Sequence, residues 1–455
     1  MTQRVPRPLH RFLISAVLSC LMLTPAPAAP IPPPARPAPD ESVTMHGLSL
    51  KERSAVFDKV WSSVDERYYD PAFNGVDWKA IRVQYEPRIA SAESDSAFYD
   101  LIKRMVEELH DAHTRFSTPQ EWQNREKHRG VSPGFGVDLV EGKTVITSVT
   151  PGSQAARNGL APGMTLLSID GRAVDARLAE VGASHSRNSS DRADLLRAYR
   201  NILSGPAGSV VQLELQRADG SVWHTSVTRA FQSYSLKVQE KSLPSGFAYI
   251  RFDEFQSTTP REFKHALRSV QSAPGLIIDL RGNGGGTLTS MLQIAGYLLP
   301  ERTRFALDRT RTGKPFSAMG GLFKVGLELY AGQKGHQLYS GPVAILVRGR
   351  TASAAEIFSA GLQEAGRAQV FGTQTCGCVL GIVKNRKVKG GGVLEISEML
   401  WLTPKGRKLE GEGVLPDHEI RPSIADFQQR RDAQLEEAEK SLRAAVRTAR
   451  AVSGR

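Results

Sequence analysis

Apolar residues between positions 50 and 110 recur at intervals of three and four, the spacing of an amphipathic helix. One stripe consists of Val56, Phe57, Val60, Trp61, Val64 and Tyr68, and a second of Phe98, Leu101, Ile102, Met105, Val106 and Leu109. Such stripes are typical of helix faces that pack into a core. We therefore predict a helical N-terminal region over residues 46–130. The second stripe ends at a polar segment, residues 111–116, where a helix end can present a side chain to a site.

The hydrophobic period changes to two between residues 131 and 232, where segments 145–149 and 210–215 alternate as strands do. Turn signals separate them at Pro151-Gly152, Pro162-Gly163, Asp170-Gly171 and Asp219-Gly220. This pattern predicts a small, strand-rich domain over residues 131–232.

Strands and helical segments alternate after residue 232. The segments 248–252, 275–280 and 343–347 read as strands, and the last two are apolar enough to be buried. Such alternation predicts an α/β layer, over residues 233–424, with sites at the strand ends. Residues 425–455 read as a charged helix whose sparse apolar positions, Leu435, Leu442 and Val446, favour a solvated cap. The predicted fold class is multidomain α+β.

The first 29 residues have the pattern of a secretory signal peptide. Arg4, Arg7 and Arg11 precede the short apolar run 12–23, and small residues follow at 26–29. Residues 30–45 form a proline-rich linker. We therefore predict an exported protein, in the bacterial periplasm, without a membrane span. The alternative is a lipoprotein anchored at Cys20, which would shorten an already short apolar run.

Composition removes several classes of function. Three cysteines in 455 residues cannot build a disulfide framework or a four-thiolate zinc site. The net charge of +12 is spread along the chain rather than gathered in blocks, so we predict no nucleic-acid partner. No cofactor is predicted.

Two short segments carry candidate chemistry. Gly282-Asn-Gly-Gly-Gly286 follows a buried strand, and glycines there allow free N–H groups to face an oxyanion. A phosphate cradle and a plain tight turn are the alternatives, although the lysine of a phosphate loop is absent. Ser353 stands among small residues at a predicted helix start, where it is either a helix cap or a nucleophile.

Taken in order, these segments resemble the C-terminal processing (tail-specific) serine peptidases. The resemblance lies in residues 276–286, in Thr351-Ala-Ser-Ala-Ala-Glu-Ile357 and in Gly411-Glu-Gly-Val-Leu-Pro-Asp417. It implies a ClpP/crotonase-like α/β peptidase core, with Ser353 as nucleophile and an oxyanion hole from Ala354 and Gly286, or Gly285 next. It also implies an endopeptidase that cleaves polypeptides, and the signal peptide makes this an exported one.

The strand-rich domain in turn resembles a PDZ domain. Gly134-Phe-Gly-Val-Asp-Leu139 stands where such domains bind a peptide carboxylate, which implies peptide-binding roles for Gly134, Phe135, Gly136 and Val137. The implied partners are polypeptides with a free C-terminus, added as a strand to a sheet edge. Residues 176–200 are longer than is usual in such domains.

The family's lysine base is missing, because Cys378 stands 25 residues after Ser353. Three hypotheses compete. His113 can serve as base with Glu410 in support, as in the tricorn-like branch, since the reference pKa of histidine is about 6.5. Lys384 or Lys387 can fold back as a replacement. Alternatively, the protein is a catalytically inactive periplasmic peptide-binding scaffold.

Cys376 and Cys378 leave their own state open. A Cys-x-Cys pair in an oxidising compartment can form a strained disulfide, bind a soft metal or remain as free thiols. Cys378 is also conceivable as a nucleophile, although Ser353 fits the family position better.

Overall fold

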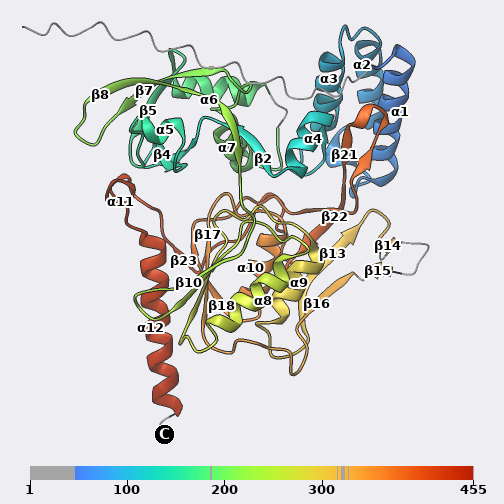
Figure 1. Cartoon of the computed structure of the whole chain (residues 1–455). Coiled ribbons are helices and arrows are strands. Elements are labelled where there is room, and N and C mark those ends of the chain that lie inside the picture. The colour runs from blue at the N-terminus through green and yellow to red at the C-terminus, as the bar shows by residue number, and fades with distance from the viewer. Residues whose placement is uncertain (1–46, 185–186, 315, 319–322, 326, 454–455) are drawn as a thin grey trace, which may run out of the picture. The chain divides into compact units, whose positions relative to one another are not determined.

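The computed structural model describes residues 47–453, apart from 185–186, 315, 319–322 and 326 (Figure 1). The predicted signal peptide 1–29, the linker 30–45 and Cys20 lie outside the described residues. By their contacts, residues Gly47–Arg455 form one unit. Among the described helices, none has the length and apolar character needed to cross a membrane.

The N-terminal region begins with α1 (Leu50–Arg67), α2 (Trp78–Ala90) and α3 (Asp95–Glu107), of which α1 and α3 carry the two predicted apolar stripes. Helix α1 begins at a capping box in which the Ser49 hydroxyl and the Glu52 carboxylate satisfy each other's backbone N–H groups. The stripe residues are buried in one cluster, with Trp61 and Leu101 at its margin. The 3₁₀ turn η1 (Phe73–Gly75) lies between α1 and α2.

A polar segment leads from α3 toward the rest of the unit. Strand β1 (Arg115–Ser117) pairs antiparallel with β21 (Val393–Glu395), which itself pairs with β20 (Arg386–Lys387). Helix α4 (Pro119–Glu126) follows β1. Residues 111–114 are therefore held beside strands that come from the far end of the sequence.

The β-rich module, residues 129–233, contains an antiparallel sheet in the order β3-β4-β5-β7-β8. Its strands are β3 (Phe135–Val140), β4 (Lys143–Val149), β5 (Thr165–Ile169), β7 (Val210–Gln216) and β8 (Val222–Thr228), with β6 (Arg172–Ala173) beside β5. Strands β2 (Arg129–Ser132) and β9 (Ala230–Ser233) pair at the two ends of the module. Its helices are α5 (Gln154–Arg157), α6 (Val174–Ala183) and α7 (Asp191–Asn201).

The central sheet of the core is mostly parallel and has the order β10-β11-β12-β17-β18-β23. Its strands are β10 (Gln239–Ser242), β11 (Ala248–Arg251), β12 (Leu276–Asp279), β17 (Val343–Val347), β18 (Ala368–Gly372) and β23 (His418–Glu419). Only β10 runs antiparallel to its neighbour. The apolar runs seen in the sequence are thus inner parallel strands, and their carboxyl ends lie at one edge.

Strand alternation divides the core between the two faces of this sheet. Ile250, Ile278 and Ile345 pack with α8 (Thr259–Ser269), α9 (Leu288–Gly296) and α10 (Ala354–Glu364), whereas Tyr249, Ile277 and Leu346 pack with α12 (Figure 1). A second sheet, in the order β16-β13-β22-β19, lies against the other side of α10. Its strands are β13 (Thr303–Thr310), β16 (Glu328–Ala331), β19 (Leu380–Ile382) and β22 (Ser397–Leu402). Strands β14 (Phe316–Ala318) and β15 (Phe323–Val325) pair with each other, and η3 (Lys389–Gly391) precedes β21.

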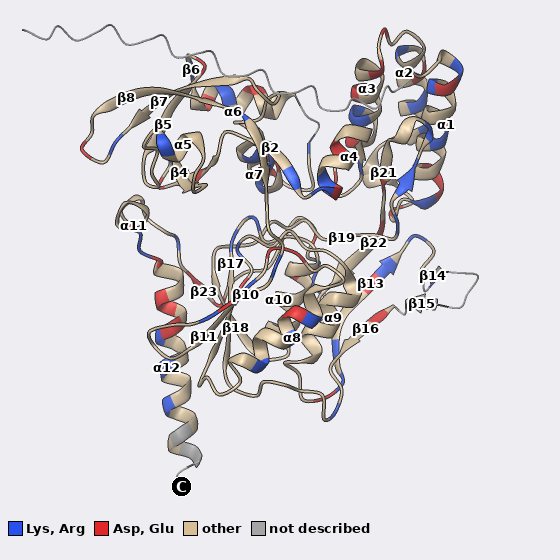
Figure 2. Ribbon diagram, in the orientation of Figure 1, with Lys and Arg blue, Asp and Glu red and all other residues tan. Residues whose placement is uncertain are grey.

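The C-terminal segment is helical, as α11 (Ile424–Gln429) and α12 (Ala433–Ser453). Acidic residues gather in the first half of α12 and basic residues in the second, which suits the helix dipole (Figure 2). The prediction of a solvated cap is wrong, because Ala438 and Leu442 are buried against the central sheet. Leu435 and Val446 pack at the margin of that contact, so the sparse apolar positions are one helical stripe.

Asp308 on β13 is a buried carboxylate without a hydrogen-bond partner among the described residues. It lies opposite Trp401 on β22. Burial raises the pKa of Asp308 to about 6. Because the folded chain binds this proton more tightly than the unfolded chain does, ionisation of Asp308 destabilises the fold as the pH rises through about 6.

We expect Asp308→Asn to raise the free energy of unfolding at pH 8 by about 1–2 kcal/mol, because the neutral amide avoids burying a charge. The gain should vanish near pH 4, where the aspartic acid is itself neutral. Denaturant unfolding at both pH values measures this difference. The control is Asp100→Asn on the exposed face of α3, for which no change is expected. Equal effects of the two substitutions at pH 8 would contradict the burial argument.

Candidate active site

Ser353 lies in a turn between the buried strand β17 and helix α10, at the carboxyl edge of the central sheet. Its backbone has φ 57° and ψ −124°, a conformation that residues with a side chain rarely adopt. The Ser353 N–H donates to the Cys378 carbonyl at 2.8 Å and to Glu356 Oε2 at 3.0 Å. Two hydrogen bonds thus hold the serine in a strained turn, and strain of this kind gathers at functional sites.

The glycine loop after β12 lies directly against Ser353. A Cβ atom on Gly285 would lie 2.6 Å from the Ser353 Cβ and 3.1 Å from the Ala354 nitrogen. The Gly285 N–H already donates to Asn283 Oδ1 at 2.9 Å. Gly286 bridges Phe255 through the Gly285 carbonyl and the Thr287 N–H, so this bridge leaves the N–H of Gly286 itself unused. Gly286 is an exposed residue next to Gly285, and Ala354 is the first residue of α10, directly after Ser353.

Glu356, fully buried in the first turn of α10, ties the serine turn to the loop before β19. Its carboxylate accepts hydrogen bonds from the Thr375 hydroxyl and from the N–H groups of Gly377 and Cys378, at 2.8 and 3.1 Å. Burial raises the pKa of Glu356 to about 7, although these hydrogen bonds act in the opposite direction. The residue is a fixed support rather than a group open to substrate.

Cys376 and Cys378 form a disulfide within the same loop. The pair is buried and packs in a cluster with Ala193 of α7, with Ala352 and Ala112 at the margin. This cluster brings the segment before β1 next to the serine turn, although the two segments are about 240 residues apart in the sequence. Of the three states that the sequence left open, the structure has the disulfide.

His113 follows Ala112 and is buried, with 8% of its surface exposed. The Asp111 carboxylate accepts the N–H groups of His113 and Thr114, at 2.7 and 2.6 Å, and so fixes the turn that carries the imidazole. His113 Nδ1 has no hydrogen-bond partner among the described residues. Burial, and next the charge of Arg115, lowers the pKa of His113 to about 4, so the imidazole is neutral at pH 7.

Glu410 is buried but does not hold His113. Its two oxygens accept hydrogen bonds from the Ser189 hydroxyl, in the segment before α7, and from the Val379 N–H. Burial raises the pKa of Glu410 to about 8, with a smaller contribution from the charges of Asp111 and Glu356. The arrangement links the β-rich module to the loop that holds Ser353.

The alternative lysines are placed differently. Lys384 and Lys387 follow β19 in the sequence, and both are exposed. Lysines that serve as general bases in proteins usually stand in buried surroundings. Their surroundings do not favour a role as general base.

Gly134 directly precedes β3, whose first residues are 135–137, and β3 is an edge strand of its sheet. Gly134 has φ 85°, and a Cβ there would lie 2.6 Å from the Ser153 Cβ, so glycine is required. The Val137 carbonyl accepts a hydrogen bond from Arg350 at 3.3 Å. Since Arg350 is three residues before Ser353, the edge strand is connected to the serine turn.

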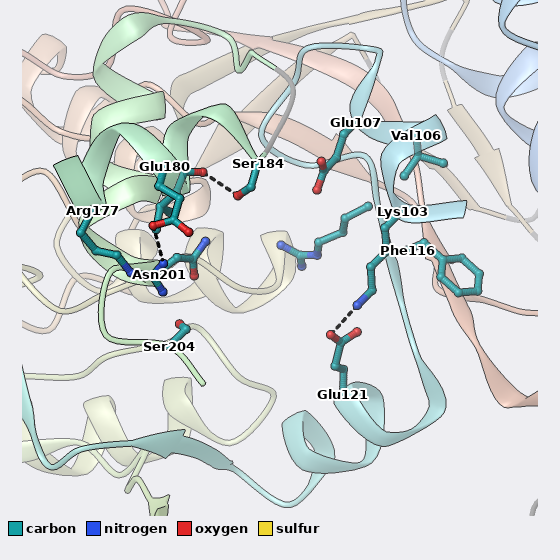
Figure 3. A pocket seen from close by; sticks show the side chains of 12 residues that line it. Lys103, Val106, Glu107, Phe116, Glu121, Arg177, Glu180, Ser184, Asn201 and Ser204 are labelled. Atoms are coloured by element: carbon teal, nitrogen blue, oxygen red, sulfur yellow. Dashed lines mark hydrogen bonds and ion pairs between the residues drawn. The ribbon is translucent and has the colours of Figure 1, made fainter. Parts of the chain in front are cut away.

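A separate cavity of about 550 Å³ lies beside the segment that leads to β1 (Figure 3). Its charged lining is balanced, with a Lys103–Glu121 ion pair at 2.6 Å and an Arg177–Glu180 ion pair at 3.0 Å. Ser353 and the glycine loop do not line this cavity. No group of three or more metal-ligating side chains occurs among the described residues.

Sequence reasoning did not assign roles to Glu356 or Ser189. Glu356 stands in the same motif as Ser353. Its only signal was the loop around Gly377, whose backbone N–H groups need an acceptor. Ser189 lies in the long segment 176–200, and no sequence pattern connects it with Glu410, 221 residues away.

Residues 246–420 match the family described as peptidase family S41, and residues 49–107 match the tricorn protease C1 domain. A carboxyl-terminal-processing protease of Synechocystis sp. is 26% identical over 397 residues, which cover 84% of each chain. The chloroplastic carboxyl-terminal-processing peptidase 3 of Arabidopsis thaliana is 25% identical over 390 residues, covering 81% of this chain and 69% of the relative. These matches confirm the resemblance predicted from the three motifs.

Two solved structures share the fold. The photosystem II D1 C-terminal processing protease has a TM-score of 0.54 at 23% identity, covering 81% of this chain and 93% of that one. Mature CPAF, solved in complex with lactacystin, has a TM-score of 0.65 at 14% identity, covering 88% and 99%. At such identities the likeness concerns the fold.

Proposed function

We propose that this chain, whose residues 246–420 match peptidase family S41, is an exported serine endopeptidase of the C-terminal processing family. The observation that carries the proposal is the close contact between the strained Ser353 turn and the glycine loop. A Cβ atom on Gly285 would lie only 2.6 Å from the Ser353 Cβ. A serine in such a turn has its hydroxyl beside backbone N–H groups that can stabilise an oxyanion.

In the proposed reaction Ser353 Oγ attacks the scissile carbonyl while His113 accepts the hydroxyl proton. The low pKa of His113 keeps the imidazole neutral and able to accept that proton at neutral pH. The N–H groups of Gly286 and Ala354 stabilise the oxyanion, aided by the positive end of the α10 dipole. His113 then gives the proton to the leaving amine, and water releases the acyl group from Ser353.

Glu410 has a supporting role in this proposal. It holds the Val379 N–H and the Ser189 hydroxyl, and so fixes the loop that follows the Cys378 position. The proposal does not require a hydrogen bond between Glu410 and His113.

The substrates are polypeptides with a free C-terminus, selected by the β-rich module acting as a PDZ domain. Support comes from β3, an edge strand that is directly preceded by Gly134 in a left-handed conformation. Backbone N–H groups in such a loop can capture a carboxylate, while the edge strand pairs with the substrate backbone. The predicted signal peptide, residues 1–29, adds export to the periplasm.

The chain should cleave an unfolded polypeptide that ends in apolar residues with a free carboxylate faster than its C-terminally amidated twin. Capture of the carboxylate lowers KM, so we expect a rise in KM of roughly tenfold on amidation, with kcat little changed. Initial rates over a range of concentrations of both polypeptides measure this. Equal KM values would remove tail selection from the proposal and leave the peptidase.

The second candidate function is a catalytically inactive peptide-binding scaffold. The observation that favours it is the unpartnered Nδ1 of His113, which lacks the orienting carboxylate of a working triad. Binding of the free-tailed polypeptide without any cleavage, across a broad set of sequences, would establish this candidate in place of the peptidase.

A further inference from the structure

We propose that the Cys376–Cys378 disulfide is a positioning element for Ser353, so that turnover depends on its being oxidised. The inference rests on the proposed peptidase function and goes beyond it, since it assigns a role to the two residues that replace the family's lysine segment.

The loop that contains the disulfide holds the serine turn on both sides. The Cys378 carbonyl accepts the Ser353 N–H at 2.8 Å, and the Cys376 N–H donates to the Thr351 carbonyl at 3.0 Å. Between them, the N–H groups of Gly377 and Cys378 hold Glu356. The position of Ser353 is therefore set by residues inside the ring that the disulfide closes.

Hydrogen bonds also hold this loop from outside, since Arg192 donates to the Thr375 carbonyl and the Gly411 N–H donates to the Gly377 carbonyl, each at 2.8 Å. The loop lies between β18 and β19 without regular secondary structure, and its middle residue, Gly377, has φ 71°. Glycine gives the backbone the widest choice of conformations, which works against a fixed loop. A covalent bond across the glycine removes most of that freedom.

The two cysteines are buried against neighbouring side chains. Cys376 and Cys378 have 2% and 8% of their surface exposed, and they pack against Ala193, Ala352 and Ala112. Two unbonded sulfur atoms must move apart to van der Waals contact, so reduction forces the loop to shift. The shift reaches Ser353 through the Cys378 carbonyl and reaches the His113 turn through Ala112.

Reduction requires a two-electron donor, which we take to be a dithiol. One thiolate of the dithiol attacks a sulfur of the pair, the Cys376–Cys378 bond breaks, and the second dithiol sulfur displaces the mixed disulfide. The protein gains two electrons and two protons as two thiols, and the dithiol becomes a cyclic disulfide. An oxidant that accepts the same two electrons restores the pair.

The test uses the full chain carrying Cys20→Ser, so that Cys376 and Cys378 are the remaining cysteines. The chain is assayed oxidised, after dithiothreitol, and after re-oxidation with diamide, with alkylation and mass spectrometry to count free thiols. We expect kcat to fall roughly ten- to a hundredfold on reduction, with KM changed less than about twofold, and to recover on re-oxidation. The matched control adds Cys376→Ser and Cys378→Ser, and its kcat should be low and unaffected by dithiothreitol.

Hydrogen exchange separates this proposal from the proposed function. On reduction, the amides of residues 351–356 and 374–379 should exchange faster, whether or not the chain cleaves a substrate. An oxidised chain that cleaves nothing overturns the peptidase function alone. Fully alkylatable thiols with unchanged kcat, or with unchanged exchange in both segments, overturn the positioning role. If the double-serine variant does not fold, the reversible reduction of Cys376–Cys378 in the chain with both cysteines still tests the positioning role.

Discussion

Replacing Ser353 by alanine is expected to abolish turnover, and His113→Ala is expected to cost nearly as much, roughly 10⁴-fold in kcat. A serine hydroxyl is a weak nucleophile until a base accepts its proton, so removing either partner removes most of the same catalysis. Initial rates with a fluorogenic peptide measure both losses. The matched control is Lys384→Ala, which alters an exposed lysine of the competing hypothesis and should keep kcat within about twofold of the unsubstituted chain.

The pH profile identifies the base independently of these substitutions. Protonation of His113 removes its ability to accept a proton, so kcat/KM should fall as the pH drops through about 4, the lowered pKa of this buried imidazole. A lysine base would instead lose activity below an alkaline or neutral pKa. If His113→Ala turned over as fast as the unsubstituted chain while Ser353→Ala was inactive, another group would serve as base.

The fold could be predicted from the sequence where the periodicity of apolar residues matches the face that is buried. The stripes in residues 50–110 are buried faces of α1 and α3, and segments 276–279 and 343–347 are inner strands of a parallel sheet. The C-terminal helix was misjudged for the opposite reason. Its apolar positions are few and surrounded by charge, and only the sheet face that receives Ala438 and Leu442 reveals that they form a contact.

The candidate site was predictable in its backbone and much less so in its side-chain partners. Ser353 and Gly285 come together because β12 and β17 are neighbouring parallel strands that end at the same edge of the sheet. Ser189 and Glu410 meet only through tertiary packing, which no local pattern encodes. Likewise, the Cys-x-Cys spacing permits a disulfide, a metal or free thiols, and the burial around the pair is a property of the folded chain.

Gly285→Ala is expected to lower kcat by roughly 10²- to 10³-fold while the chain stays folded. The new methyl group would lie 2.6 Å from the Ser353 Cβ and 3.1 Å from the Ala354 nitrogen, so the serine turn and one oxyanion donor must both move. Displacing a single oxyanion donor costs a factor of this size. Because Gly285 has φ 105°, the substitution also strains the backbone, by about 1–2 kcal/mol.

The adjacent residue provides the control that separates these effects. A Cβ on Gly284 meets nothing within 4 Å, and its φ lies outside the left-handed range, so Gly284→Ala should leave both kcat and stability unchanged. A second control, Gly159→Ala, has φ 89° and open space, and carries the backbone strain without the contact with Ser353. If strain alone mattered, Gly285→Ala and Gly159→Ala would lose similar stability and neither would lose turnover. If the glycine loop forms the oxyanion hole, only Gly285→Ala loses kcat, and normal turnover in that variant would place the oxyanion elsewhere.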